Sequence, residues 1–328
     1  MTADTEQDAY GEDILGPGYE ARTLTLEPDD EGDVVATLVR RSRVGGSRRA
    51  VLYVHGFVDY FFQTHLADEW SDAGYTFYAL DLRKYGRSVR AHQTPNYITS
   101  LESYDEELDE AARIIREEEG HEVLVVMGHS TGGLITSLWA HRRRGRGMVD
   151  ALVLNSPWFD LNASVLTRTI GTAAVDRLGV RRPRAVVGKL GSAYGHYLHR
   201  GTGGEWDYDL AWKPHGGFPV VAGWFRTIRR GHAELNRGLA IDCPVFVACS
   251  DATSNPVKEP GRISSTDVVL DVEHIAGRAP KLGPLVTLVR IPGGIHDLTL
   301  SPEPARSAFH AELSRWRDAY VPAVPDAL

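Results

Sequence analysis

The sequence predicts an α/β fold with a mostly parallel central sheet, helices on both faces and an inserted cap. Three observations support this prediction. Short apolar runs alternate with segments of helical spacing through most of the 328 residues, as strands and helices do in such folds. Several runs are apolar throughout, which is typical of strands buried on both faces of a parallel sheet. The alternation stops between residues 157 and 240, an interval far longer than a crossover connection needs.

The chain is expected to begin with a flexible arm followed by an antiparallel hairpin. Residues 1–18 are mainly polar and acidic and contain Gly and Pro, which indicates a flexible arm. Strand-forming residues at 22–26 and 34–39 flank the turn-forming sequence Pro28-Asp-Asp-Glu-Gly32. Two such runs joined by a short turn predict two antiparallel strands.

The parallel part of the sheet is expected to start at Ala50–His55 and to continue at Thr76–Leu80. Between them, residues 65–73 have helical spacing, and Gly74 is placed to end that helix. A second helix is expected to start at Ser103–Glu106, which has the sequence of a capping box. The later strands are expected at 123–127, 151–154, 244–248 and 285–291, and a helix follows the first of them.

Charge and composition exclude several classes of partner and location. A net charge of −8 argues against nucleic acid as a partner. The first twenty residues lack the pattern of a signal peptide, and no apolar run is long enough to cross a membrane. Cys243 and Cys249 flank the apolar run 244–248, and a strand of that length holds them too far apart to bond each other. Two free thiols fit a reducing compartment, so we expect a cytoplasmic protein without stable membrane insertion.

Residues 157–240 are expected to form a cap inserted into a sheet domain made of residues 19–156 and 241–328. The interval contains four of the seven Trp residues, and it has 12 Lys or Arg against 6 Asp or Glu. Two interpretations of its aromatic residues remain open: they line an apolar substrate cleft, or they form the small core of the cap itself. Its positive charge suits an anionic substrate, although a solvated surface is the commoner role of such charges.

The sequence Gly128-His-Ser-Thr-Gly132 has the G-x-S-x-G pattern of a nucleophile elbow. In such an elbow a buried strand turns sharply into a helix, and the serine at the turn faces the substrate. Glycines are needed because side chains beside the serine would clash with neighbouring backbone. The short pattern also arises by chance, but here an apolar strand precedes it and a helix with an apolar face follows. We therefore predict that Ser130 is a nucleophile.

A serine hydroxyl becomes a good nucleophile only when a neighbouring base accepts its proton, so a histidine is required. When the serine stands on such an elbow, the acid and then the histidine follow it in the chain. Of the 13 histidines, only His296 lies on the loop directly after the last predicted strand, behind the turn Pro292-Gly-Gly294. We predict that His296 is the general base.

Two aspartates compete for the role of the acid that orients this histidine. Asp251 directly follows the strand at 244–248, which is the usual position of the acid. Asp267 comes later, in a loop that leads into a helix, and residues 252–266 would then be an inserted loop. The logic of a catalytic triad gives the acid a role but not a sequence position, so the choice stays open. Two weaker candidates are Asp271, as a helix N-cap, and Asp297, as the neighbour of the histidine.

The tetrahedral intermediate of acyl transfer needs hydrogen-bond donors where its oxyanion forms. One donor should be the backbone N–H of Thr131, the residue after the nucleophile. The second should come from the loop after the Ala50–His55 strand, where Gly56 lets the backbone approach and the N–H of Phe57 would donate. The neighbouring His55 is expected to be structural, hydrogen-bonded within this loop.

These residues resemble the α/β-hydrolase superfamily and, within it, the monoacylglycerol lipase-like and lysophospholipase-like serine hydrolases, also labelled serine aminopeptidase-like. The resemblance covers about residues 35–156 and 241–315, and not the arm or the cap. It places Asp267 ahead of Asp251, because Asp267-Val-Val-Leu-Asp-Val-Glu273 resembles the acid loop of the family. The other matching sequences are Tyr53-Val-His-Gly-Phe57, Ala79-Leu-Asp-Leu-Arg-Lys-Tyr-Gly-Arg-Ser88, Gly128-His-Ser-Thr-Gly-Gly133 and Gly293-Gly-Ile-His-Asp297.

The resemblance implies an α/β-hydrolase fold and a serine hydrolase that needs no metal or organic cofactor. Its substrate is expected to be a small carboxylic ester, with an apolar acyl chain or an aromatic group, such as a monoacylglycerol or a lysophospholipid. The implied catalytic residues are Ser130, His296 and Asp267, with Phe57 and Thr131 as oxyanion donors.

Two other functions remain open at this point. The same triad serves hydrolysis of an amide, a lactone or a peptide N-terminus, and Glu205, Asp207 and Asp209 are carboxylates in the cap that could hold a substrate amine. A function of another class is non-catalytic ligand binding on a hydrolase fold. That function is less favoured, because proteins of this kind often lack a triad member, whereas Ser130 and His296 are both present here.

Overall fold

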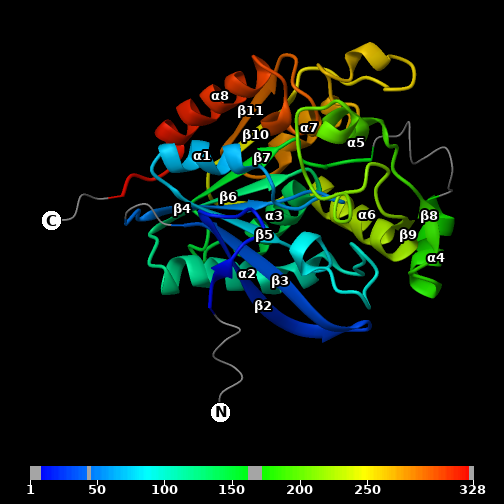
Figure 1. The fold of residues 1–328 in the computed structure, drawn as a ribbon, viewed down its shortest axis with the longest axis horizontal. Coiled ribbons are helices and arrows are strands. Elements are labelled where there is room, and N and C mark those ends of the chain that lie inside the picture. The colour runs from blue at the N-terminus through cyan, green and yellow to red at the C-terminus, as the bar shows by residue number, and fades with distance from the viewer. Residues whose placement is uncertain (1–8, 43–45, 162–171, 325–328) are drawn as a thin grey trace.

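A computed structural model describes residues 9–42, 46–161 and 172–324. In these residues the main sheet has the strand order β1-β2-β3-β5-β4-β6-β7-β10-β11 (Figure 1). The strands from β5 to β11 run parallel, whereas β1, β2, β3 and β5 pair antiparallel. The mostly parallel sheet that the sequence predicts is therefore confirmed. The strands are β1 (Gly11–Glu12), β2 (Tyr19–Asp29), β3 (Gly32–Arg41), β4 (Arg49–Val54), β5 (Thr76–Asp81), β6 (Val123–His129), β7 (Ala151–Asn155), β10 (Val245–Ser250) and β11 (Val286–Ile291).

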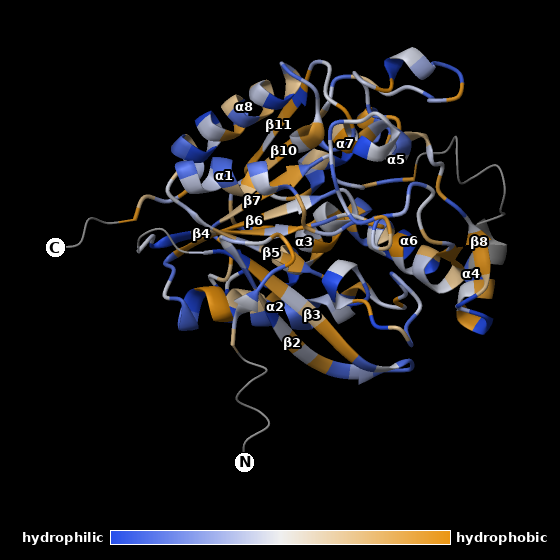
Figure 2. Cartoon of the chain, in the orientation of Figure 1, coloured by the Kyte–Doolittle hydropathy of each residue, from blue (hydrophilic) through white to orange (hydrophobic). Residues whose placement is uncertain are grey.

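Helices cover both faces of the sheet, because successive strand residues point to opposite faces and both sets are apolar here. In β4, Leu52 belongs to one buried cluster and Tyr53 to the other. Figure 2 shows the strands as mainly hydrophobic and the outer helix surfaces as mixed or hydrophilic. One face carries α2 (Asp105–Arg113), α3 (Thr131–Arg142), α6 (Ala222–Asn236) and α7 (Val272–Arg278), and the other carries α1 (Thr64–Asp72) and α8 (Ala305–Tyr320).

The segment from residue 9 to residue 18 is not a loose arm, contrary to the prediction for residues 1–18. Its strand β1 pairs with β2. The carboxylate of Asp13 is buried against the guanidinium of Arg87, with Oδ2 and Nε 2.7 Å apart. A polar, acidic sequence does not distinguish a solvated carboxylate from a buried, paired one, and this explains the error. The predicted residues 1–8 of the arm lie outside the described residues.

The capping box predicted at Ser103–Glu106 is also wrong. Ser103 lies inside a 3-10 helix, η2 (Leu101–Tyr104), which runs directly into α2. The capping side chain is that of Ser100, whose hydroxyl accepts a hydrogen bond from the N–H of Glu102 at 3.3 Å. The extra 3-10 turn moves the cap one turn earlier than the sequence pattern indicates.

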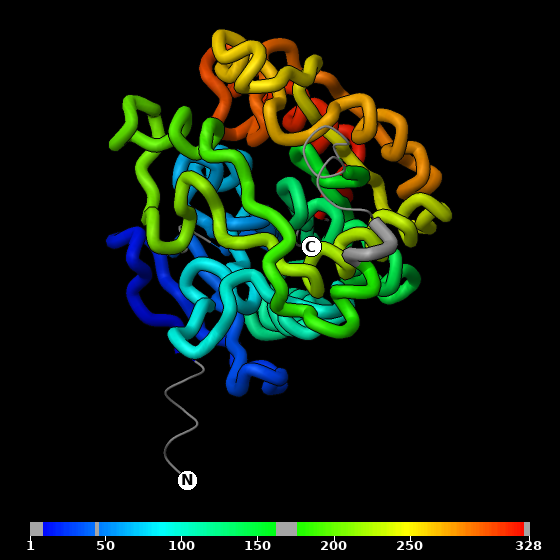
Figure 3. The backbone as a smooth tube through the Cα atoms, turned by 90° about the vertical axis from the view of Figure 1, so that its right-hand side faces the viewer, coloured from blue at the N-terminus to red at the C-terminus, as the bar shows by residue number. Residues whose placement is uncertain are grey.

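Between β7 and β10 the chain leaves the sheet and lies beyond the carboxyl ends of the parallel strands. Figure 3 looks at the molecule from that side and shows residues 180–240, in green to yellow-green, in front of the sheet. α6 packs beside α3, the helix that follows the predicted elbow. The described elements before α6 are α4 (Thr172–Arg181), β8 (Val186–Gly188), α5 (Ala193–Leu198), η4 (Arg200–Thr202) and β9 (Val220–Val221).

The four tryptophans of residues 157–240 do not form a separate core of that segment. Trp158 and Trp224 are buried in the same cluster as the side chains of α2 and α3. Trp206 and Trp212 are only partly buried, and they pack against a small cluster that includes Tyr60 of the sheet domain. The aromatic residues therefore join the segment to the sheet domain.

The cysteines are unpaired, as predicted. Cys243 and Cys249 are both buried and free. Burial raises the pKa of each thiol to about 12, so that little thiolate forms near neutral pH. In the part of the chain that the structure describes, no helix has both the length and the apolar composition needed to cross a bilayer.

Candidate active site

Ser130 stands at a sharp turn between β6 and α3, with φ 53° and ψ −116°. Positive φ is strained for a residue with a Cβ atom, and the surrounding backbone holds this conformation. The N–H of Ser130 donates to the carbonyl oxygen of Asn155 at 3.0 Å, and the N–H of Trp158 donates to the carbonyl oxygen of Ser130 at 2.9 Å. A Cβ atom on Gly132 would lie 2.3 Å from the carbonyl oxygen of His55, so only glycine fits there.

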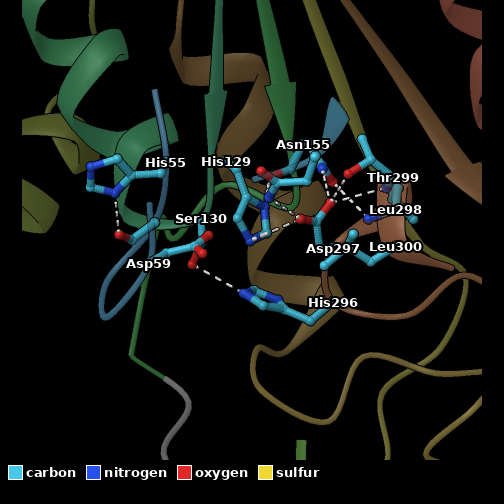
Figure 4. Close-up of polar contacts among 12 residues, drawn as sticks. His55, Asp59, His129, Ser130, Asn155, His296, Asp297, Leu298, Thr299 and Leu300 are labelled. Atoms are coloured by element: carbon cyan, nitrogen blue, oxygen red, sulfur yellow. Dashed lines mark hydrogen bonds and ion pairs between the residues drawn. The ribbon is translucent and has the colours of Figure 1, made fainter. Parts of the chain in front are cut away.

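The structure brings Ser130, His296 and Asp267 together through two hydrogen bonds. His296 Nε2 lies 3.1 Å from Ser130 Oγ (Figure 4), and His296 Nδ1 lies 2.9 Å from Asp267 Oδ2. The carboxylate accepts the Nδ1–H proton, which leaves Nε2 free to accept the proton of the serine hydroxyl. The three residues are at most 7 % exposed, so water competes little for these bonds.

Asp267 reaches the end of β10 because the chain after that strand makes an excursion and returns. Residues 253–266 leave the sheet, and Thr253 and Asp267 form a β-bridge where the excursion closes. The N–H of Asp267 donates to the carbonyl oxygen of Ala252 at 3.0 Å. The second carboxylate oxygen, Oδ1, accepts from the N–H groups of Val269 and Leu270 at 2.8 and 2.7 Å. The carboxylate is thus fixed while Oδ2 faces the imidazole.

The competing aspartates have other partners. Asp251 is exposed, and its Oδ1 accepts a hydrogen bond from the N–H of Gly293 at 3.2 Å, in the turn before His296. Asp271 is the N-cap of α7, as predicted, and accepts from the N–H of Glu273 at 3.0 Å. Of the two aspartates that the sequence left open, only Asp267 is hydrogen-bonded to the imidazole.

The two N–H groups predicted as oxyanion donors stand on either side of Ser130. Thr131 is the first residue of α3, and Phe57 lies in the loop after β4. Gly56 brings this loop against the elbow, since a Cβ atom there would lie 3.0 Å from Ser130 Cβ. Within the described ranges, neither N–H has a hydrogen-bond acceptor. Val58, the residue after Phe57, has φ 53°, which is a second strained position beside the elbow.

His55 has the structural role that the sequence predicts. Its Nε2 accepts from the N–H of Leu82 at 3.0 Å, and its Nδ1 donates to the carbonyl oxygen of Gly56 at 2.8 Å. Burial lowers the pKa of this histidine, so it is neutral near neutral pH. It therefore holds the loop after β4 that carries the Phe57 N–H, here called the oxyanion loop, to the chain after β5.

A second buried carboxylate, Asp297, lies beside the triad and has a larger role than the sequence indicates. It accepts hydrogen bonds from Asn155 Nδ2 and Thr299 Oγ1, both at 2.7 Å (Figure 4). Its Oδ2 lies 3.9 Å from Nε2 of His129, whose ring centroid is 5.0 Å from that of His296. Burial by itself raises the pKa of Asp297, but the neighbouring His129 and the hydrogen bonds from Thr299 and Asn155 lower it overall. The carboxylate is therefore ionised and ties the histidine loop to β7.

Side chains of the 157–240 segment also reach the site, and sequence reasoning missed these contacts. Tyr194 Oη accepts from the N–H of Asp297 at 3.0 Å, and its ring lies edge-on to His296 with centroids 5.8 Å apart. Trp224 stacks on Phe57 with ring centroids 3.9 Å apart. No motif marks such residues, because their partners are distant in the sequence.

A further ion pair joins the segment to the oxyanion loop. Lys213 Nζ lies 2.6 Å from Oδ1 of Asp59, a carboxylate that is 2 % exposed and follows Phe57 by two residues. The next residue, Tyr60, accepts a hydrogen bond from the N–H of Asp209 at 2.7 Å through its hydroxyl. These two contacts therefore attach the loop that carries the Phe57 N–H to the 157–240 segment.

The arrangement can transfer a proton from a serine hydroxyl to an imidazole and then bind a developing oxyanion. Among the residues that the structure describes, no group of three or more His, Cys, Asp or Glu side chains is placed to hold a metal ion.

Comparisons with known proteins agree with this geometry. Residues 45–202 match the family model described as serine aminopeptidase, S33. The match includes Ser130 and part of the 157–240 segment, which the resemblance in the sequence did not cover, and it ends before Asp267 and His296. None of the curated protein sequences is significantly similar to the chain.

Solved structures with the same fold include two monoacylglycerol lipases and an esterase. The monoglyceride lipase of Saccharomyces cerevisiae is 16 % identical, with a TM-score of 0.66, and the match covers 91 % of this chain and 96 % of that one. The monoacylglycerol lipase of Paleococcus ferrophilus is 20 % identical, with a TM-score of 0.59 and coverages of 85 % and 97 %. A carboxyl esterase of Bacillus coagulans is 13 % identical, with a TM-score of 0.64 and coverages of 92 % and 99 %.

The strand order and the similarity to these solved structures lead to one conclusion. The chain has the α/β-hydrolase fold.

Proposed function

We propose that the protein is a serine hydrolase that cleaves carboxylic esters through an acyl-enzyme. The observation that carries this proposal is the chain of hydrogen bonds from Ser130 Oγ to His296 Nε2, at 3.1 Å, and from His296 Nδ1 to Asp267 Oδ2, at 2.9 Å. The N–H groups of Phe57 and Thr131, which have no acceptor among the described residues, add the donors that such chemistry needs.

In the proposed mechanism, Ser130 Oγ attacks the ester carbonyl carbon while His296 Nε2 takes the hydroxyl proton. The carbonyl oxygen becomes an oxyanion and accepts hydrogen bonds from the N–H groups of Phe57 and Thr131. His296 then gives the proton to the leaving alkoxide, and the acyl group stays on the serine. Water, deprotonated by the same imidazole, releases the carboxylic acid and restores the hydroxyl. Asp267 keeps the imidazole in the required tautomer throughout.

The proposed substrate has an apolar acyl chain or an aromatic group. Phe57 is partly buried and stacks on Trp224, and Trp158 lies next to Trp224 with ring centroids 5.8 Å apart. The Phe57 ring, backed by the two buried tryptophans, makes the surroundings of the oxyanion loop apolar. The solved structures of similar fold include two monoacylglycerol lipases and a carboxyl esterase, which supports monoacylglycerol-like or lysophospholipid-like substrates. We also propose that residues 157–240 act as the cap that selects among them.

A fluorophosphonate probe tests the proposal, because it reacts with an activated serine. We expect the wild-type protein to be labelled and Ser130→Ala not to be labelled. p-Nitrophenyl esters of increasing chain length, assayed with the same two proteins, then define the acyl preference. Labelling of the Ser130→Ala variant would show that another residue is the nucleophile. A wild-type protein without labelling would support the non-catalytic, ligand-binding alternative.

One observation favours a second function, hydrolysis at a peptide N-terminus. The matching family model is described as serine aminopeptidase. However, the carboxylates that could hold a substrate amine have other partners: Glu205 pairs with Arg306 at 3.0 Å, and Asp209 accepts from the N–H of Ala211 at 2.7 Å. Asp207 is 70 % exposed. Aminoacyl p-nitroanilides assayed beside the esters distinguish the two functions, and we expect the esters to be the better substrates.

We further propose a cytoplasmic location, on the basis of the two free, buried cysteines. Fractionation of the cells that make the protein, followed by the fluorophosphonate label, tests this location.

A further inference from the structure

One hydroxyl group at the elbow has no hydrogen-bond partner. Thr131 directly follows Ser130 and is only 2 % exposed. Its Oγ1 is buried without a partner among the residues that the structure describes. Buried hydroxyl groups are rarely left unpaired, because they have lost water without gaining a hydrogen bond. An unpaired hydroxyl beside a nucleophile is therefore available to a bound ligand.

Two other hydroxyl groups of the same helix, unlike that of Thr131, have hydrogen-bond partners. Thr136 Oγ1 donates to the carbonyl oxygen of Gly132 at 2.8 Å, and Ser137 Oγ donates to that of Gly133 at 2.6 Å. This is the usual bond of a hydroxyl inside a helix, made to the carbonyl four residues earlier. Thr131 cannot make it, because it is the first residue of α3 and the residue four positions earlier lies in β6.

The place of Thr131 in the helix also gives its side chain a direction. The Cα–Cβ bonds of a helix tilt toward its N-terminal end, and the free N–H groups of the first turn point the same way. The side chain and the N–H of Thr131 are therefore directed toward the end of α3 where Ser130 stands. The oxyanion of the proposed reaction forms at this end.

We propose that Thr131 Oγ1–H donates a third hydrogen bond to the oxyanion, beside the N–H groups of Thr131 and Phe57. The inference rests on the proposed function and adds a catalytic side chain to it. The hydroxyl keeps its proton, and its bond strengthens as negative charge develops on the carbonyl oxygen. Because the ground-state carbonyl carries less charge, the bond lowers the barrier more than it improves substrate binding.

Thr131→Val tests the proposal, because valine has nearly the same shape and keeps the backbone N–H but has no hydroxyl. With p-nitrophenyl butyrate, we expect kcat to fall by about tenfold to a hundredfold with little change in KM. Thr131→Ser keeps a hydroxyl and is expected to stay within about threefold of wild type. Since the lost hydroxyl had no partner in the free protein, the Tm of Thr131→Val should not fall.

Ser137→Ala is the matched control, because it removes a buried hydroxyl that is already bonded within α3. We expect it to lower Tm while kcat stays within about threefold of wild type. A Thr131→Val variant whose kcat stays within about twofold of wild type overturns the inference. So does a loss of kcat that is accompanied by a comparable fall in Tm. If the wild-type protein neither labels at Ser130 nor hydrolyses esters, the proposed function itself has failed, and the inference fails with it.

Discussion

The turn that carries Ser130 and Gly132, which forms the floor of the proposed site, is held in place by one kind of contact. The 157–240 segment, which lies over this turn, is held by another. At the floor, Ser130 is fixed by backbone hydrogen bonds, and Gly132 approaches the chain after β4 so closely that no Cβ atom fits. The 157–240 segment is attached largely through side chains, such as Lys213 to Asp59. Side-chain contacts can be changed one at a time, whereas a tight backbone turn cannot. The difference suggests that the reaction is set by the sheet domain and that its substrate range can change with the segment.

The largest expected effect concerns the floor of the site. Asp267→Asn keeps the shape of the side chain but removes the charge that fixes the His296 tautomer, so kcat should fall by about 10⁴-fold. Asp251→Asn is the control, because Asp251 is exposed and accepts only a backbone hydrogen bond from Gly293. We expect it to retain wild-type kcat within about threefold. Equal losses in the two variants, measured with one p-nitrophenyl ester, would contradict the assignment of the acid.

The next effect concerns the ion pair between the segment and the oxyanion loop. Lys213→Met leaves the carboxylate of Asp59 buried without a partner, and removing one member of a buried pair is strongly destabilising. Because the lysine is 15 % exposed, we expect a loss of about 2 kcal/mol in the free energy of unfolding, measured with urea. The double variant Asp59→Asn with Lys213→Met should recover part of this loss. A single variant as stable as wild type would show that the pair does not hold the segment.

Acidic pH should destabilise both regions through two histidines, His232, which is buried, and His310, which is half-buried. Burial lowers the pKa of His232, in α6 of the segment, and of His310, in α8 of the sheet domain, to about 4. An unfolded chain binds these protons near the ordinary pKa of 6.5, and the folded protein binds them only near 4. Stability is therefore fully present above pH 6.5 and falls as the pH drops toward 4, by about 3 kcal/mol for each histidine.

The substitutions His232→Gln and His310→Gln test whether the two regions unfold together. If they do, each substitution should reduce the decrease in Tm between pH 6.5 and pH 4, and the two reductions should be similar. An effect of His310→Gln alone on the main transition would show that the segment unfolds separately from the sheet domain.

The smallest expected effect concerns an exposed contact of the segment. Glu205 is 55 % exposed and pairs with Arg306 of α8 at 3.0 Å. Exposed ion pairs contribute little, since water and salt screen them. Glu205→Gln should change the free energy of unfolding by no more than about 0.5 kcal/mol. A change as large as that of Lys213→Met would remove the distinction between buried and exposed attachments.

The positions of the parallel strands and of the sharp turn at Ser130 were predictable from the sequence because both depend on local patterns. Continuous apolar runs mark the parallel strands, and the elbow pattern places Ser130 between β6 and α3. Asp267 could not be chosen on the residues alone, because its position depends on a β-bridge to Thr253 that closes the excursion after β10. The prediction of Ser103 as a helix cap was wrong because an extra 3-10 turn precedes α2.

Contacts between residues that are far apart in the sequence could not be predicted from the sequence. Asp297 is hydrogen-bonded to Asn155, 142 positions away in the sequence, and to Tyr194, 103 positions away. The sequence Asp297-Leu-Thr299 does carry a local signal, since the carboxylate caps the N–H of Thr299 at 3.0 Å. That signal indicates a turn but not the position of the carboxylate beside His129.

The burial of Cys243 and Cys249 makes the chain suitable for spectroscopic labelling. Their raised thiol pKa values leave both unreactive at neutral pH, so introduced cysteines would react selectively. Thr202→Cys on the segment and Arg315→Cys on α8 are both exposed positions for nitroxide labels. The distance distribution between two such labels, recorded by pulsed electron paramagnetic resonance with and without a bound ester analogue, would show whether the segment moves relative to α8 when a ligand binds.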